Sequence, residues 1–505
     1  MNQAAQISRW AKVLDQSRCI GCHACSTACK SEHGVPLGVN RTYVKAVDVG
    51  SFPAARRAFQ VTRCNQCDDA PCTIACPTRA MYRRPDGIVD FDKSICIGCK
   101  ACIAACPYDA IFINPEDHSA EKCNLCSHRI DAGLEPACVT VCPTSAIIVG
   151  DLDDPTSAVA RIVQRDVVAV RRPEKDTRPK VFYKGAHAAT LDPLAARRPA
   201  GGLFMWSEQP RVPHAVAAGH PGQGNSSAAA LLAYDVAHRA PWDWRVSLYT
   251  WTKGIAAGVY LVGLLLLALG ALQPADTLWR WVVPITGGAF LGLTGMVLIA
   301  DLDHPERFHL IFTRHHGQSW LVRGAFIIAG YGAVLAAHFA ASLAGEGRLS
   351  AWLGIAGGPL AAMTAVYTAF LFAQAKARDL WQSPLLPPHL AVQAVVAGSA
   401  ALLLFEPAIA VPHAALSWLL ASAAAVHVLM VLGEITLTHG TAHARLATDE
   451  MTVGAYARGF WAGLALAAVA VAAPWLPTLP PIAALAGLLA FEHAHVQAGQ
   501  AVPLA

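Results

Sequence analysis

The chain has 505 residues, a formal net charge of +4 and 54% hydrophobic residues. This length has room for two or three domains, and the nearly balanced charge gives no reason to expect binding to nucleic acid. The averages conceal two unlike parts, because all 16 cysteines fall in the first 142 residues whereas residues 246–498 are almost continuously apolar. We therefore expect a soluble N-terminal domain joined to a membrane domain.

The cysteines form four groups of four. The first and third groups have the spacing C-x2-C-x2-C-x3-C, the second has C-x2-C-x4-C-x3-C, and the fourth has C-x2-C-x11-C-x3-C. In three groups the last cysteine is followed by a proline, at Pro77, Pro107 and Pro143. The candidate metal ligands are Cys19, Cys22, Cys25, Cys29, Cys64, Cys67, Cys72, Cys76, Cys96, Cys99, Cys102, Cys106, Cys123, Cys126, Cys138 and Cys142.

This spacing is typical of [4Fe–4S] clusters, in which three close cysteines surround one cluster and the fourth reaches a neighbouring cluster. Each iron needs one soft thiolate, so 16 cysteines provide the ligands of four clusters. Two alternatives are weaker. Structural zinc sites usually pair two C-x2-C halves or include histidine. Disulfides require an oxidising compartment, and residues 1–15 have neither the apolar core nor the twin arginine of an export signal.

Short strands are predicted beside the cluster loops, at residues 88–92, 110–113 and 146–149. Residues 181–183 are a further candidate strand of the same domain. We expect an α+β ferredoxin-like fold with several [4Fe–4S] clusters over residues 1–195. Because so many cysteines leave little apolar core, the iron should supply much of the cohesion, and the apo form should fold poorly.

Four segments around the cysteines resemble the four-cluster iron–sulfur subunit of the dimethyl sulfoxide/polysulfide reductase family. They are RCIGCHAC from Arg18, RCNQC from Arg63 with Pro71-Cys72, CIGCKAC from Cys96 and KCNLC from Lys122. The resemblance covers roughly residues 10–195 and implies which cysteines share a cluster. The implied sets are Cys19, Cys22, Cys25 with Cys142; Cys123, Cys126, Cys138 with Cys29; Cys64, Cys67, Cys72 with Cys106; and Cys96, Cys99, Cys102 with Cys76. The sequence alone leaves this pairing open.

Residues 196–245 are predicted to be a linker. A basic, proline-broken stretch precedes and enters it, at residues 171–180 and 195–199, and residues 219–227 are rich in Gly and Ser, which is typical of a flexible segment. We interpret the basic stretch as a solvated linker. The alternative is a segment that lies on anionic lipid headgroups or on a partner subunit.

Residues 246–505 are predicted to be an all-α transmembrane bundle of about eight helices, with seven as the alternative. The apolar runs lie near 247–272, 279–301, 319–343, 350–373, 389–406, 413–437, 455–476 and 479–498, and the last is the weakest because it ends in Glu492, His493 and His495. If the N-terminus is inside, ten basic positions share its side, namely Arg239, Arg245, Lys253, Arg307, Arg314, Arg323, Lys376, Arg378, Arg445 and Arg458, against Arg280 and Arg348 opposite. This bias predicts a multi-pass protein of the cytoplasmic (inner) membrane, with the iron–sulfur domain on the cytoplasmic side.

The membrane half resembles the NrfD/PsrC-type quinone-interacting subunit. The matching segments are YTWTKGIAAG from Tyr249, DLDHPERF from Asp301, SWLVRG from Ser319, YTAFL from Tyr367 and WQSPLLP from Trp381. In this family the iron–sulfur and membrane parts are usually two chains, whereas here they look fused. The resemblance implies a site for a quinone or quinol (ubiquinone or menaquinone) and no haem.

The polar residues of the first four spans agree with a quinone site. Tyr249, Lys253, Asp301, Asp303, His304, Arg307, Arg323 and Tyr367 all fall at the cytoplasmic ends of these spans in the predicted topology. A quinol oxidised there needs hydrogen bonds to both oxygens and a base for two protons, and ionisable groups at membrane depth are usually functional. His304 and Tyr367 are the preferred partners of the quinone oxygens, and Asp301 or Asp303 is the candidate proton acceptor. The alternative is that Lys253, Arg307 and Arg323 are interfacial anchors.

Further polar residues occur inside the spans, with His338 in the third and Glu406, His427, Glu434, Glu492 and His493 in later ones. A structural hydrogen bond to a neighbouring helix is the simplest role for each of them. A proton path is the second hypothesis. Haem ligation by His338 and His427 is the weakest, because the predicted topology puts them at different depths.

Together these features predict an electron-transfer and quinone-reacting subunit of a membrane-bound oxidoreductase, with no catalytic residues of its own. The resemblance implies a separate catalytic partner that carries a molybdenum or tungsten bis-pterin cofactor, besides contact with membrane lipid. A cytoplasmic catalytic side favours oxidation of a donor such as sulfite or formate. Two alternatives remain: the iron–sulfur/quinol subunit of a respiratory complex resembling alternative complex III, and a non-enzymatic membrane protein whose clusters sense redox state.

Overall fold

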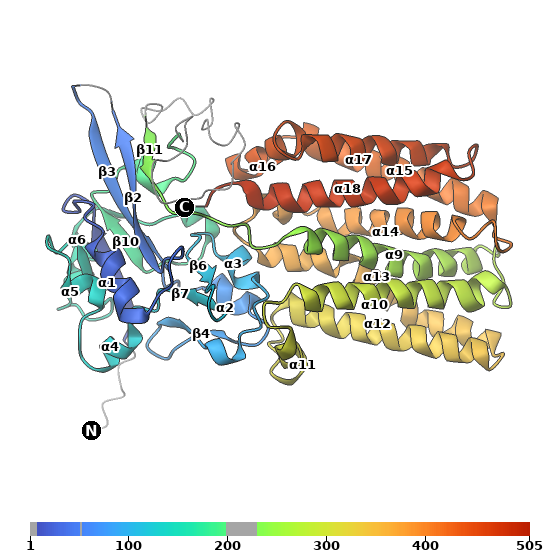
Figure 1. Cartoon of the computed structure of the whole chain (residues 1–505), viewed down its shortest axis with the longest axis horizontal. Coiled ribbons are helices and arrows are strands. Elements are labelled where there is room, and N and C mark those ends of the chain that lie inside the picture. The colour runs from blue at the N-terminus through green and yellow to red at the C-terminus, as the bar shows by residue number, and fades with distance from the viewer. Residues whose placement is uncertain (1–7, 51–52, 198–229, 505) are drawn as a thin grey trace. The chain divides into compact units, whose positions relative to one another are not determined.

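The computed structural model describes residues 8–50, 53–197 and 230–504 (Figure 1). These residues form two compact units. The first unit runs to Pro241 and includes residues 375–377 and 502–504, and the second comprises Trp242–Gln374 and Arg378–Ala501. The flexible segment predicted at residues 219–227 lies outside the described residues. We call the two units the cluster unit and the helical unit.

The main sheet of the cluster unit has the strand order β8–β1–β10–β9. Its strands are β1 (Trp10–Asp15), β8 (Ile147–Asp151), β9 (Val168–Ala169) and β10 (Val181–Lys184), with β1 parallel to β10 and antiparallel to β8. Ala11 and Val13 of β1 pack against α6 (Ala158–Arg165), whereas Leu14 packs in a cluster with cysteines. Because side chains alternate along a strand, Lys12 faces the cysteine side together with Leu14.

A second sheet has the order β11–β2–β3, from Leu231–Tyr234, Thr42–Val49 and Arg56–Arg63. β2 and β3 form an antiparallel hairpin in which Thr42 pairs with Arg63. β11 pairs antiparallel with β2. The segment predicted to be a linker, residues 196–245, therefore contributes a strand to the cluster unit.

The remaining strands form two small hairpins, β4 (Met81–Arg83) with β5 (Val89–Phe91) and β6 (Ile111–Ile113) with β7 (Ala120–Lys122). The strands predicted from the sequence are confirmed at β5, β6, β8 and β10. Short helices fill the space between strands: α1 (Ala24–His33), α2 (Pro71–Ala75), α3 (Ala101–Ala105), α4 (Ser127–Asp131), α5 (Ala137–Thr140), α7 (Ala188–Leu191), η1 (Lys93–Ile95) and η2 (Pro173–Lys175). α1 and α3 begin alike, because His23 and Lys100 hold the left-handed conformation at equivalent places in two cysteine groups, with φ of 60° and 61°.

The basic stretch at residues 171–180 is partly inside the cluster unit. Arg171 and Lys180 are each only 1% exposed. The Arg171 guanidinium lies 5.9 Å from the centre of the Tyr108 ring, and Lys180 pairs with Asp68 at 3.1 Å. The interpretation of this stretch as a solvated linker is therefore wrong for these two residues, because each has a partner from a distant part of the unit.

The helical unit has seven helices, among the described residues, that are long and apolar enough to cross a membrane. They are α9 (Trp244–Ala268), α10 (Val283–Ala300, preceded by the π-helical turn Leu278–Val282), α12 (Trp320–Leu343), α13 (Gly347–Gln374), α14 (Leu386–Leu403), α15 (His413–Thr436) and α18 (Leu479–Ala501). α16 (Ala442–Thr452) and α17 (Ala457–Val469, continued by η7, Ala470–Ala472) form a bent pair at 74° that gives the eighth candidate. Short turns lie between them at η5 (Pro305–Arg307), α11 (Leu310–Thr313) and η6 (Asp379–Gln382).

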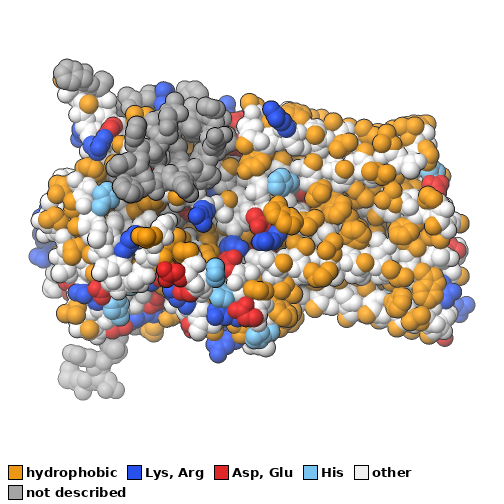
Figure 2. All heavy atoms as spheres, in the orientation of Figure 1, with side chains coloured by type: hydrophobic (Ala, Val, Ile, Leu, Met, Phe, Trp, Pro, Cys, Tyr) orange, Lys and Arg blue, Asp and Glu red, His pale blue; other side chains and the backbone are white. Residues whose placement is uncertain are grey.

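The helices agree with the predicted bundle of about eight spans, with one difference. The last run, which is the weakest in the sequence, is a continuous helix, whereas the run predicted near 455–476 corresponds to α17 with η7 and is preceded by a bend from α16, which was not predicted. Hydrophobic side chains cover the visible face of this unit (Figure 2). Trp352, Ile355 and Leu429 are each more than 60% exposed, as expected for side chains that face lipid.

Glycines allow close packing between two pairs of helices. A Cβ atom at Gly258 of α9 would overlap the Ala394 carbonyl oxygen of α14, and Gly398 meets Gly258 from the other side. Gly463 of α17 and Gly487 of α18 approach each other in the same way. Such contacts between small residues are the usual means by which membrane helices approach closely.

Candidate metal centres and a buried polar site

The cysteines of the cluster unit are brought together in four sets, each with three cysteines from one group and a fourth from another. The electrostatic neighbours are Cys22, Cys25 and Cys142 around Cys19; Cys123, Cys126 and Cys138 around Cys29; Cys64, Cys67 and Cys106 around Cys72; and Cys76, Cys96 and Cys99, with Cys72 of the adjacent set, around Cys102. These are the sets that the family resemblance implies.

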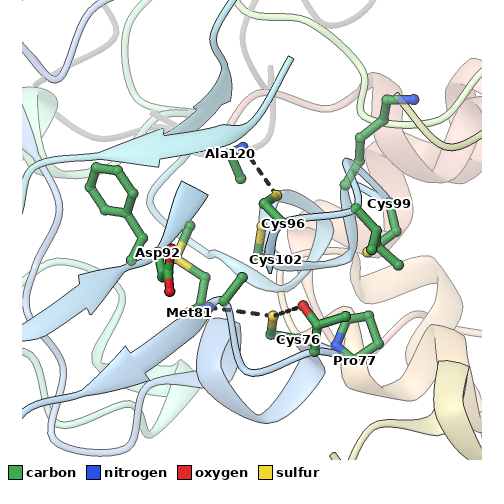
Figure 3. Close-up of a pocket in the computed structure, with 13 residues that line it drawn as sticks. Cys76, Pro77, Met81, Asp92, Cys96, Cys99, Cys102 and Ala120 are labelled. Carbon is green, nitrogen blue, oxygen red and sulfur yellow. Dashed lines mark hydrogen bonds between the residues drawn. The ribbon is translucent and has the colours of Figure 1, made fainter. Parts of the chain in front are cut away.

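One set lines a cavity of the cluster unit (Figure 3). Cys76, Cys96, Cys99 and Cys102 surround it, with about 360 Å³ of space that includes its opening to solvent. The backbone N–H groups of Met81 and Ala120 donate to the Cys76 and Cys96 sulfurs, both at 3.4 Å. Among the residues with defined positions, no group of three or more His, Cys, Asp or Glu has the geometry for a single metal ion. A cluster suits this arrangement, because each thiolate binds a different iron.

The pKa values of the thiols also indicate which kind of metal centre the cysteine sets can bind. Burial and the neighbouring thiolates Cys123 and Cys138 raise the pKa of Cys29 to about 12. Burial, and then Cys64, raises the pKa of Cys106 to about 12. Thiolates packed this closely in the protein interior need a positive centre to remain ionised. The iron of a cluster supplies that charge, so the donor set fits the group.

One set has basic neighbours that were not predicted. Lys12 Nζ lies 3.9 Å from both the Cys123 and the Cys138 sulfur, and Arg63 Nη1 donates to the Cys138 sulfur at 3.1 Å. Burial alone would raise the pKa of Cys138, but Lys12 and Arg63 lower it to about 7. The sequence holds a weak signal for Lys12, which is a charged residue flanked by apolar residues within β1.

Three residues of the predicted quinone site meet inside the helical unit. Lys253 of α9 is 1% exposed, and its ammonium donates to the Ala365 carbonyl at 2.9 Å and to the Thr368 hydroxyl at 2.6 Å. The ammonium also lies 4.9 Å from the centre of the Tyr367 ring. Tyr249 is within electrostatic range of Tyr367. Lys253 is therefore buried among the helices of this unit.

The other five predicted residues lie on the segment between α10 and α12 or at its ends. Asp301 is buried and in electrostatic range of Tyr249, and Asp303 is half-buried. His304 Nδ1 contacts Glu306 Oε1 at 3.0 Å, and the Arg307 Nε lies 3.7 Å from the same carboxylate. Arg323 is exposed and donates to the Gly317 carbonyl at 2.8 Å. Only Asp301 of these five lies at the buried site.

Glu492 joins this site, and further ionisable residues form a separate cluster in the same unit; the sequence did not predict either contact. Glu492 of α18 accepts a hydrogen bond from the Thr250 hydroxyl and acts electrostatically on Lys253. On the neighbouring helices, His389 Nε2 lies 2.9 Å from His427 Nδ1, and His389 Nδ1 lies 3.7 Å from the Glu434 carboxylate. His389 was not predicted, because a single histidine near the start of α14 carries no signal by itself.

The histidines considered as haem ligands lie in different surroundings. The His338 ring lies 4.5 Å from the Trp279 ring and 5.8 Å from the Tyr260 ring. His427 instead contacts His389 and Phe491. Glu406 pairs with the His413 ring at 3.0 Å. His338 and His427 therefore belong to two separate polar clusters.

Comparison with known proteins identifies the family. The family described as "Polysulphide reductase, NrfD" matches residues 234–490, which is half of the chain. The chain belongs to the NrfD family. Ahead of this NrfD region, the family described as "4Fe-4S dicluster domain" matches residues 56–152. With its seven or eight candidate spans, this NrfD protein is a multi-pass membrane protein.

The iron–sulfur part has curated relatives. It is 43% identical to a subunit of the tetrathionate reductase of Salmonella typhimurium over 206 residues, which is 40% of this chain and 80% of that protein. It is 40% identical to a component of the polysulfide reductase of Wolinella succinogenes over 177 residues, 34% of this chain and 93% of that protein. It is 34% identical to the arsenate respiratory reductase iron–sulfur subunit of a Shewanella species over 223 residues, 35% of this chain and 95% of that protein. The chain thus fuses an iron–sulfur subunit of the reductase type to an NrfD domain.

Proposed function

We propose that this chain is the electron-transfer and quinone-reacting subunit of a membrane-bound oxidoreductase, and that it exchanges electrons with a separate catalytic subunit carrying a molybdenum or tungsten bis-pterin. The observation that carries the proposal is the grouping of sixteen thiols into four sets within a chain that also has a membrane bundle with a buried Tyr–Lys–Tyr site. Relatives of the iron–sulfur part are named as parts of tetrathionate, polysulfide and arsenate reductases.

Each set of four cysteines holds one [4Fe–4S] cluster in this proposal. The clusters supply one-electron transfer, and the chain supplies their thiolate ligands and the surroundings of each sulfur. Backbone N–H groups such as those of Met81 and Ala120 stabilise the negative charge on the sulfurs. Four sets in one small unit provide a route for electrons that needs no mobile carrier.

The quinone binds at the polar site of the helical unit. An ammonium group carries three N–H donors, and the two hydrogen bonds of Lys253 to Ala365 and Thr368 leave one donor for a quinone oxygen. Tyr249 and Tyr367 line the same site, with Asp301 at its edge. Glu492 is the buried carboxylate placed to exchange a proton, because quinone turnover moves two protons with two electrons. Asp303, His304, Arg307 and Arg323 lie on the adjoining segment and guide the headgroup.

The iron–sulfur domain lies on the cytoplasmic side of the inner membrane in this proposal. The support is the distribution of Lys and Arg over the loops, together with the connection of the cluster unit to the start of α9.

Purification from native membranes in a mild detergent tests the proposal. We expect about sixteen iron atoms per chain, a co-purifying large subunit with molybdenum or tungsten, and reduction or oxidation of a quinone analogue. A complex containing multihaem cytochromes instead would favour a quinol:acceptor complex. A chain without a partner and without quinone turnover would contradict the proposal.

A further inference from the structure

The four cysteine sets differ in the charged groups beside their sulfurs. Lys12 lies 3.9 Å from two sulfurs of the set Cys29, Cys123, Cys126 and Cys138, and Arg63 donates to Cys138 at 3.1 Å. His33 Nε2 lies 3.1 Å from the sulfur of Cys126. Three of the four cysteines in this set therefore have a nitrogen of a basic side chain as a direct neighbour.

Both cations are deeply buried. Lys12 and Arg63 are each 1% exposed, and within the described ranges neither forms an ion pair with a carboxylate. Other buried cations of the unit do have such partners, since Arg41 pairs with Glu121 and Lys180 with Asp68. A buried cation is costly unless a negative group compensates it. For Lys12 and Arg63 the compensating charge is that of the thiolates.

The cations near the other sets are placed differently. Lys100, which acts on Cys99, is half exposed, so that water screens its charge. Lys122 acts on Cys72, but its ammonium donates to the backbone carbonyls of Val89 and Cys123. Arg63 also acts on Cys25 of the neighbouring set, but its hydrogen bond goes to Cys138. The set with Cys29 thus has two buried cations, Lys12 and Arg63, within 4 Å of its sulfurs.

A positive charge beside a cluster stabilises its reduced form, which carries one more electron. We propose that Lys12 and Arg63 give the cluster held by Cys29, Cys123, Cys126 and Cys138 the highest reduction potential of the four, so that it is the first to be reduced. This inference rests on the proposed function, because it requires the clusters to be present. A transferred electron then resides preferentially on this cluster, because Lys12 and Arg63 raise its reduction potential.

The test is a redox titration of the purified full-length protein, followed by electron paramagnetic resonance, together with an iron count. In Lys12→Met we expect the ratio of reduced to oxidised cluster at a fixed potential to fall at least tenfold for the highest-potential signal, a shift of about 59 mV for one electron. The other three signals should stay in place. Lys12→Arg keeps the charge and should keep the potential. Arg63→Gln is the second variant and should shift the same signal in the same direction.

Lys180→Met is the matched control. Lys180 is also 1% exposed, but it binds the Gly87 carbonyl and Asp68 instead of a cysteine. It should leave all four potentials unchanged. Cys123→Ser should abolish the highest-potential signal, and loss of a lower-potential signal would overturn the inference. An unshifted highest potential in both Lys12→Met and Arg63→Gln would also overturn it. A wild-type protein without clusters would instead refute the proposed function itself.

Discussion

The role of Lys253 can be interpreted only from its surroundings in the structure. In the sequence it is a basic residue near the start of an apolar run, where an interfacial anchor and a quinone ligand are both reasonable. In the structure it is 1% exposed and bound to Ala365 and Thr368. An amine buried at this depth and bound to other helices has a role beyond anchoring the helix.

Lys253→Met tests that role. We expect kcat/KM for a quinone analogue to fall at least tenfold, about 1.4 kcal/mol, because a charged hydrogen bond to the substrate is lost. The iron content and the four cluster signals should not change. Arg458→Gln is the control, since Arg458 is an exposed cation at the start of α17. Equal turnover in Lys253→Met and wild type would place the quinone elsewhere.

The sequence shows the cysteines fully but not what surrounds them. Their spacing is a local signal, so every candidate ligand can be named from it. Lys12 and Arg63 lie 111 and 75 positions from the cysteines they approach, and no local pattern reports such a contact. The predicted quinone residues were chosen by position along the spans, which cannot separate the buried Tyr367 from the exposed Arg323.

Among the elements, the contact of α9 with α14 depends on glycine. Gly258→Ala places a methyl group against the Ala394 carbonyl oxygen, so the helices must separate. We expect a loss of about 1–3 kcal/mol of stability, seen as a lower thermal midpoint in detergent. Gly254→Ala, four residues earlier on α9, is the control, because nothing lies within 4 Å of its Cβ position. Equal thermal midpoints for Gly258→Ala and Gly254→Ala would contradict the proposed packing.

His238 lies on the segment that follows β11. Burial would lower the pKa of His238, but the carboxylates of Asp235 and Asp109 raise it to about 10. The folded pKa is above the unfolded value of about 6.5, so the stabilisation is complete below about pH 6.5 and is lost as the pH rises through about 10. His238→Gln should therefore lower the temperature at which the cluster absorbance is lost at pH 7, and the difference from wild type should vanish near pH 10.5.

The control for this variant is His128→Gln. His128 forms an exposed pair with Glu32 at 2.8 Å, and such surface pairs contribute little. It should change the midpoint only slightly at every pH. A His238→Gln difference that stays constant from pH 6.5 to 10.5 would contradict the assignment of charge to His238.

Elements were predictable where the pattern is local. The strands β5, β6, β8 and β10 and the apolar spans follow from short runs of sequence. The strand β11 could not be predicted in this way. It pairs with β2, almost 190 residues earlier, and only that pairing distinguishes it from a linker. The run predicted near 455–476 corresponds to α17, but α16 was missed because its segment contains Arg445, Asp449 and Glu450, and only the backbone shows that α16 and α17 form a pair bent by 74°.

At the scale of the whole molecule, the charges on the loops make a prediction about the membrane. Glu346, between α12 and α13, and Thr438, between α15 and α16, are exposed, and three candidate spans separate them, so the predicted topology places them on opposite sides. We expect Glu346→Cys to react with a membrane-impermeant maleimide in intact cells, and Thr438→Cys to react only in inverted vesicles. The reverse pattern would place the iron–sulfur domain outside.

The strand β11 has a practical consequence for anyone who divides this protein. A fragment that stops at residue 195 leaves the edge of β2 without its neighbour and removes the His238 partner of Asp109. An open strand edge invites pairing with other chains, so such a fragment should aggregate. A cut after Pro241 keeps the sheet whole. During synthesis, too, the cluster unit completes its second sheet only about ten residues before α9 begins, so its last strand and the first membrane helix leave the ribosome almost together.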